Sequence, residues 1–254
     1  MVIAVLLLYT FSIMPYLLAF ETLTPENPWF WFEILVDVIF GLDMIVILNS
    51  AYYNNKYELV TSKWMIFKHY FFGMMMIDFL AIFPFYAFEN DPNGAGARSN
   101  RFIRLFRLAR LTRIFRAVKL FSLFKSLEKS EVANEWLNFW RVNRGLLRLL
   151  LFLFSVLILA HFAACLWYLV ARFDDFGYET WVFRGDMMDK PKPYLYLVSL
   201  YWSFTTLTTV GYGDVNAVSE NEMVLALIWM MFGVGTYSFI IGTFTSVLQN
   251  YDAR

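Results

Sequence analysis

The stretch Thr209-Val210-Gly211-Tyr212-Gly213-Asp214, or TVGYGD, decides how the rest of this 254-residue chain is interpreted. Gly211 and Gly213 can adopt left-handed backbone angles without the steric penalty that a Cβ atom brings. Successive carbonyl groups can point to one side of the chain only where some residues adopt such angles. The apolar segment before the stretch, residues 194–207, is too short to cross the ~30 Å hydrocarbon core of a bilayer. We therefore interpret it as a re-entrant helix.

The composition of the chain indicates a membrane protein. Hydrophobic residues make up 59% of the chain and aromatic residues 20%, which is too apolar for a typical soluble domain. The 21 basic and 21 acidic residues balance, so bulk electrostatics predicts no nucleic-acid partner. The single cysteine, Cys165, cannot form an intrachain disulfide and is expected to be a packed core thiol. The sequence has no nucleophile–base pair, phosphate-binding loop or metal cluster, so we expect neither an enzyme nor an organic cofactor.

Long apolar segments separated by polar loops extend outward from the TVGYGD stretch. We predict an all-α membrane protein with spans at residues 2–20, 29–48, 67–88, 101–124, 145–171 and 222–248. Pro15 is expected to kink the first span. The lysines between spans concentrate in the loops after the second and fourth spans, so the positive-inside rule places both chain ends in the cytoplasm. Because the chain begins and ends at apolar segments, we expect both ends to be incompletely represented.

The fourth predicted span carries a basic residue at every third position. In an α-helix these charges lie ~4.5 Å apart along the axis. An arginine in mid-membrane costs a few kcal/mol or more, and moving one charge through the field is worth ~2.3 kcal/mol per 100 mV. We interpret the helix as a voltage sensor; the alternative is a basic amphipathic helix that lies on anionic lipid. The residues are Arg98, Arg101, Arg104, Arg107, Arg110, Arg113, Arg116 and Lys119.

Buried arginines need acidic partners, and the second and third predicted spans provide them. Asp43, one turn after Phe40, and Asp78 on the third span are the first candidates. Asp37 and Glu33, one turn apart, would serve nearer the outer side. The lipid-surface alternative predicts no such acids in neighbouring spans. A simpler role also stays open, in which these acids pair statically and only hold the bundle together.

Several stretches resemble a known family. TVGYGD resembles the selectivity filter of potassium channels. The whole chain resembles six-span voltage-gated-type potassium channels of the cyclic-nucleotide-binding-domain superfamily, nearest the ether-à-go-go and plant inward-rectifier branches. The stretches that carry this resemblance are residues 160–168 (AHFAACLWY), residues 201–206 (YWSFTT), residues 78–84, Phe40-x-x-Asp43, and the spacing of Gly233, Tyr237 and Gly242.

The resemblance implies a four-helix voltage-sensor bundle and a two-span pore with a re-entrant pore helix, assembled as a tetramer. It places the sensor at residues 1–124, a linker at 125–144 and the pore at 145–254. Potassium would exchange its water shell for backbone carbonyls of four copies of one loop. Those carbonyls belong to Thr209, Val210, Gly211 and Tyr212, together with the Thr209 hydroxyl, and Gly213 completes the filter. Thr209, where pacemaker channels have cysteine, favours K⁺ over a mixed Na⁺/K⁺ current.

Further residues receive roles around this filter. Asp214 is expected to hydrogen-bond to the pore helix, with Trp202 as a candidate donor. Phe40 looks like the occluded site that sensor arginines pass. His161 is expected to form an interhelical hydrogen bond. In the last span, Gly233 and Gly242 can absorb a gating bend, or can allow close helix packing, while Tyr237 and Ile241 share a face that would line the inner cavity.

We therefore expect a voltage-gated, K⁺-selective channel in the plasma membrane or a ciliary membrane. Its partners are the lipid bilayer and three further copies of the chain, or homologous subunits. One alternative is a hyperpolarisation-activated or weakly selective cation channel, and another is a non-conducting membrane subunit of a larger assembly. These residues do not support binding of a cyclic nucleotide, and the number of arginines does not determine the sign of the voltage dependence.

Overall fold

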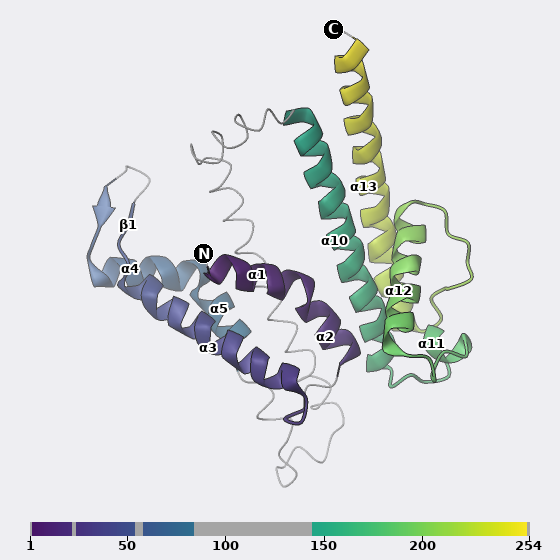
Figure 1. Ribbon diagram of the computed structural model, residues 1–254, viewed down its shortest axis with the longest axis horizontal. Helices are drawn as coiled ribbons and strands as arrows, with labels where there is room; N and C mark the ends of the chain where they lie inside the picture. The colour runs from purple at the N-terminus through teal and green to yellow at the C-terminus, as the bar shows by residue number, and fades with distance from the viewer. Residues whose placement is uncertain (1, 22–23, 54–57, 84–143, 253–254) are drawn as a thin grey trace. The chain divides into compact units, whose positions relative to one another are not determined.

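The computed structural model describes residues 2–21, 24–53, 58–83 and 144–252 (Figure 1). This part of the chain is almost entirely helical, as the sequence predicts. Four of its helical stretches are long and apolar enough to cross a membrane: Val2–Phe20, Lys63–Ile82, Phe152–Phe173 and Glu220–Phe239. The predicted fourth span, which holds Arg98 to Lys119, and the linker at 125–144 lie outside the described residues, except for Arg144 at the start of the next helix.

The described residues form two compact units, and the first predicted span is divided between them. The first unit contains α1 (Val2–Ser12) and the elements from α3 to α5, whereas residues 15–21, most of α2 (Met14–Phe20), belong to the second unit. The helix breaks at Ile13, two residues before Pro15. Proline cannot donate a backbone hydrogen bond and its ring crowds the preceding turn, so the predicted kink is confirmed.

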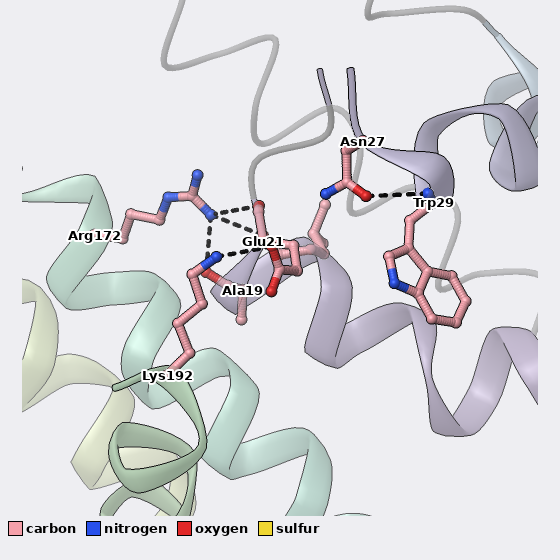
Figure 2. A network of polar contacts seen from close by, with 7 residues as sticks. Ala19, Glu21, Asn27, Trp29, Arg172 and Lys192 are labelled. Carbon is pink, nitrogen blue, oxygen red and sulfur yellow. Dashed lines mark hydrogen bonds and ion pairs between the residues drawn. The ribbon is translucent and has the colours of Figure 1, made fainter. Parts of the chain in front are cut away.

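In the first unit, the helix α3 (Pro28–Asn49) covers the residues of the predicted second span, although it is not among the four helices named above. Asn27 caps its N-terminus by accepting a hydrogen bond from the Trp29 amide at 3.1 Å, and Pro28 has no amide hydrogen to leave unpaired (Figure 2). Buried residues recur every third or fourth position of α3, which produces one inward face: Phe30, Glu33, Val36, Asp37 and Phe40. Leu7 of α1 packs with Val36 and Phe40 in the core of this unit.

The third predicted span begins earlier than expected and is not uniform. It begins at Lys63 rather than residue 67 and consists of α4 (Lys63–Tyr70), a π-helical turn η1 (Phe71–Met75) and α5 (Met76–Ile82). A small antiparallel hairpin precedes it, in which β1 (Tyr52–Tyr53) pairs with β2 (Leu59–Val60). Two-residue strands and a single π turn leave no periodic signal, so the sequence analysis found neither.

The second unit contains the helices expected of a pore. They are α10 (Arg144–Phe173), α11 (Trp181–Arg184), α12 (Lys192–Leu207) and α13 (Glu220–Asp252). The helix α12 packs against both α10 and α13, which also contact each other (Figure 1). It ends at Leu207, as predicted, and Thr208 separates it from the TVGYGD stretch. The short helix α11, in the loop between α10 and α12, was not predicted.

Small and aromatic residues of α10 let α12 approach closely. Ala160 and Ala164 are fully buried, and the rings of Trp167 and Trp202 stack at 3.7 Å between centroids with 8° between their planes. The Nδ1 atom of His161 lies 2.9 Å from the Tyr196 hydroxyl of α12, which confirms the predicted interhelical hydrogen bond. Cys165 is buried in the same region, as expected of a core thiol.

Candidate functional site

The backbone of the TVGYGD stretch alternates in handedness. Gly211 has φ +55° and Gly213 has φ +80°, as the sequence predicts, and Thr209 has φ +61°. The residues between them, Val210 and Tyr212, do not have a positive φ. A left-handed residue at every second position turns successive carbonyl groups toward a common side. The loop therefore has left-handed backbone angles at both glycines, as predicted, and at Thr209 as well.

Thr209 adopts its unusual angle because the pore helix ends there. Its amide donates to the Thr206 carbonyl at 3.0 Å, and the Val210 amide donates to the Thr205 carbonyl at 2.9 Å. This pair of bonds is a Schellman motif, in which the left-handed position is commonly glycine. A β-branched residue in this position is uncommon and costs on the order of 1–3 kcal/mol. The cap fixes the direction in which the chain leaves α12, and no glycine marked it in the sequence.

Asp214 connects the loop to the pore helix, but through a donor other than the predicted one. Its Oδ2 atom accepts a hydrogen bond from the Tyr201 hydroxyl at 2.8 Å, and its Oδ1 atom accepts from the Val215 amide at 3.0 Å. The predicted hydrogen bond to α12 is confirmed, whereas the choice of Trp202 as donor was wrong. Neighbouring helix residues point about 100° apart, so Tyr201 reaches the loop while Trp202 stacks on Trp167.

Replacing Tyr201 with phenylalanine is expected to destabilise the loop, since Asp214 then has no donor on α12. The hydrogen bond to Asp214 raises the pKa of Tyr201 above its ordinary value of 10.0. The hydroxyl therefore stays protonated, and the bond intact, until the pH rises above that value. Currents of Tyr201→Phe should decay faster than those of the unchanged chain at neutral pH. Tyr194→Phe, on the same helix, is the control and should leave the time course unchanged.

The last helix meets the end of the pore helix at Gly233. A Cβ atom there would lie 3.4 Å from the Leu207 Cα atom, whereas one at Gly242 would meet nothing within 4 Å. The Trp229 indole donates to the Ser203 carbonyl at 3.1 Å one turn earlier. Of the two interpretations of these glycines, close packing therefore fits Gly233. Tyr237 and Ile241, the predicted cavity-lining pair, are respectively 40% and 50% exposed in this unit.

The predicted counter-charges lie inside the first unit. Glu33, Asp37 and Asp78 are all buried, and Phe40 is 2% exposed. Asp43 is half-buried and lines a cavity of about 480 Å³. Three of these acidic side chains are thus removed from solvent, as partners for membrane arginines must be.

Tyrosine hydroxyls hold two of these acids in place. Tyr9 donates to Glu33 Oε1 at 2.6 Å, and Tyr70 donates to Asp78 Oδ2 at 2.5 Å. In a regular α-helix, residues eight apart lie about 80° around the axis from each other. The π turn between Tyr70 and Asp78 winds less per residue and brings the two side chains to one face. The sequence analysis missed both tyrosines, because no motif marks them.

Within the second unit, Arg172, in the last turn of α10, holds the C-terminal end of the first span. One guanidinium nitrogen donates to the carbonyls of Leu18, Ala19 and Glu21 at 3.3, 2.8 and 3.1 Å (Figure 2). Lys192, at the start of α12, forms an ion pair with Glu21 at 2.8 Å. The last carbonyls of a helix have no partner within it and carry partial negative charge, so Arg172 satisfies and neutralises the end of α2.

The four long apolar helices are typical of a membrane protein. The chain belongs to the ion transport protein family, whose profile matches residues 1–254. The predicted resemblance to ether-à-go-go and plant potassium channels is confirmed by individual relatives, and these are channels rather than enzymes.

Three relatives illustrate the similarity. The chain is 26% identical to the voltage-gated delayed rectifier potassium channel KCNH1 of Rattus norvegicus, over 100% of this chain and 27% of that protein. It is 28% identical to the potassium channel AKT2 of Oryza sativa subsp. japonica, over 98% of this chain and 28% of that protein. It is 27% identical to the potassium voltage-gated channel protein eag of Drosophila melanogaster, over 98% of this chain and 22% of that protein. The chain therefore spans about a quarter of the length of these curated relatives.

Proposed function

We propose that this chain forms the voltage-sensing and pore-forming part of a K⁺-selective channel. The observation that carries the proposal is the alternating backbone of residues 209–213 after the C-terminal end of α12. The names of the relatives, which include potassium channels of an animal and of a plant, support the choice of ion. One chain supplies one quarter of a closed ring, so the proposal requires four copies or homologous subunits around one axis.

Selectivity follows from the chemistry of the loop. The carbonyls of Thr209, Val210, Gly211 and Tyr212, with the Thr209 hydroxyl, replace the water shell of K⁺. The C-terminal end of α12 carries partial negative charge and favours a cation in front of it. Tyr201 and Asp214 hold the outer end of the loop to the helix. The permeant ion needs no organic cofactor in this mechanism.

Voltage sensing rests on the charge pattern of residues 98–119 and on the buried acids. Arginines that move past Phe40 exchange partners between Asp43 and Asp78 on one side and Asp37 and Glu33 on the other. Each charge that crosses the field contributes ~2.3 kcal/mol per 100 mV, and four sensors add their contributions. Tyr237 and Ile241 line the inner cavity of the closed ring. We place the assembly in the plasma membrane, or a ciliary membrane, with both chain ends in the cytoplasm.

The reversal potential under a K⁺/Na⁺ gradient tests this proposal. We expect currents from the chain, reconstituted in planar bilayers, to reverse close to the K⁺ equilibrium potential. A reversal potential far from that value would instead favour the weakly selective cation channel. Absence of K⁺ flux into liposomes from purified tetramers would favour a non-conducting subunit, and a purified monomer would contradict the shared pore altogether.

A further inference from the structure

Glu222, in the first turn of α13, is a fully buried carboxylate that the proposed conduction mechanism does not use. Its Oε1 atom accepts a hydrogen bond from the Trp181 amide at 3.1 Å. Its Oε2 atom accepts from the amides of Val218 and Ser219 at 2.9 and 3.3 Å. One side chain therefore binds backbone donors of two segments that are far apart in the sequence.

Part of this arrangement is an ordinary helix start. The Ser219 hydroxyl accepts a hydrogen bond from the Glu222 amide at 3.2 Å, and Glu222 returns a bond to the Ser219 amide. This reciprocal pair is a capping box, which needs only one carboxylate oxygen and one loop residue. The bond to Trp181, 41 residues earlier at the start of α11, is additional. It ties the loop that follows the filter to a separate helix.

Side-chain packing alone does not set the distance between that loop and α11. A cavity of about 80 Å³ lies between them, with Trp181 and Met187 on the α11 side and Val215 and Asn216 on the loop side. Asp214, the outer residue of the TVGYGD stretch, also lines this cavity. Where interior space is left unfilled, packing resists movement less. The hydrogen bonds to Glu222 therefore carry much of the restraint.

We propose that Glu222 is a positioning residue for the filter, which it stabilises by fixing residues 214–219 against α11 and α13. A buried carboxylate is tolerated only while donors face it, so movement of the loop would leave the charge unsatisfied. The filter is thereby kept in its conducting geometry during long openings. This inference rests on the proposed conduction through residues 209–213.

The test compares Glu222→Gln with Glu220→Gln. An amide in place of the carboxylate turns an N–H group toward either Trp181 or the Val218–Ser219 pair, so one set of bonds is lost. Glu220 lies in the same turn but is exposed, and its variant is the matched control. During sustained opening, K⁺ current through Glu222→Gln should decay roughly tenfold faster, as expected for loss of a hydrogen bond to a charged group.

Two further measurements distinguish a positioning role of Glu222 from a general loss of structure in the variant. Raised external K⁺ should slow the decay, because an ion in the filter opposes its rearrangement, and the reversal potential at early times should not change. The proposal would be overturned if the Glu222→Gln current decayed as slowly as that of the unchanged chain. It would also be overturned if the Glu220→Gln current decayed equally fast, or if external K⁺ did not affect the decay.

A measurement on purified protein does not depend on conduction. In Glu222→Gln, amide hydrogen exchange should be roughly tenfold faster than in the unchanged chain either at Trp181 or at Val218 and Ser219, since one of these two sets of donors loses its buried acceptor. Unchanged exchange would contradict the role of Glu222 even where currents are recorded. If the unchanged chain carried no K⁺ current but exchange was faster in the variant, the proposed function would be contradicted. The role of Glu222 in fixing residues 214–219 would still be supported.

Discussion

Replacing Gly211 with alanine is expected to abolish most of the K⁺ current. Gly211 has φ +55°, and a Cβ atom at this position would meet no other atom within 4 Å. Among the described residues of one chain, the substitution therefore acts through the backbone angle and creates no clash. A residue with a Cβ atom adopts this angle at a cost of roughly 1–2 kcal/mol. Four copies add to at least about 4 kcal/mol, which lowers the population of the conducting geometry about a thousandfold.

The matched control for Gly211→Ala is Gly41→Ala. Gly41 lies within α3, and among the residues that the structure describes a Cβ atom there also meets nothing within 4 Å, but its φ is not positive. Alanine in a helix is favoured over glycine by up to ~1 kcal/mol, so this variant should fold and conduct. Single-channel recordings of both variants, with the amount of assembled protein measured in parallel, give the comparison. A normal K⁺ current through Gly211→Ala would contradict the proposed filter.

Local signals in the sequence were enough to predict several structural features of the chain. The end of α12 was found because a short apolar segment ends shortly before two glycines, and α12 does end at Leu207. The kink in the first span was found because proline cannot continue a helix. The glycine angles at positions 211 and 213 followed from the absence of a Cβ atom. Each of these features depends on residues close together in the chain.

The features that were missed depend on contacts between distant residues or on a choice between similar neighbours. Arg172 binds the end of the first span from more than 150 positions away. The capping box of Ser219 and Glu222 was visible in the sequence, but its bond to Trp181 was not. Tyr201 and Trp202 both carry a donor, and only the direction in which each faces from α12 decides which one reaches Asp214.

Replacing Trp167 with alanine is expected to give the largest loss of stability in the pore unit. Trp167 has no exposed surface, and its ring lies parallel to that of Trp202 on the pore helix. Removing a large buried aromatic side chain costs about 3–5 kcal/mol. The cavity left behind would also free Trp202, so the pore helix would lose its support from α10. The melting temperature of the purified protein, followed by size-exclusion chromatography after heating, measures the effect.

A second substitution separates packing from hydrogen bonding at this position. Within the part of the chain that the structure describes, the Trp167 indole nitrogen is buried without a hydrogen-bond partner. Trp167→Phe therefore keeps a stacked ring and removes only an unsatisfied polar group, whose burial is itself unfavourable. It should melt much closer to the unchanged chain than Trp167→Ala does. Trp64→Ala, at a site that is 72% exposed, should have little effect. If Trp167→Phe were as damaging as Trp167→Ala, the indole N–H would have an acceptor in the assembled channel, and stacking would not be what supports the pore helix.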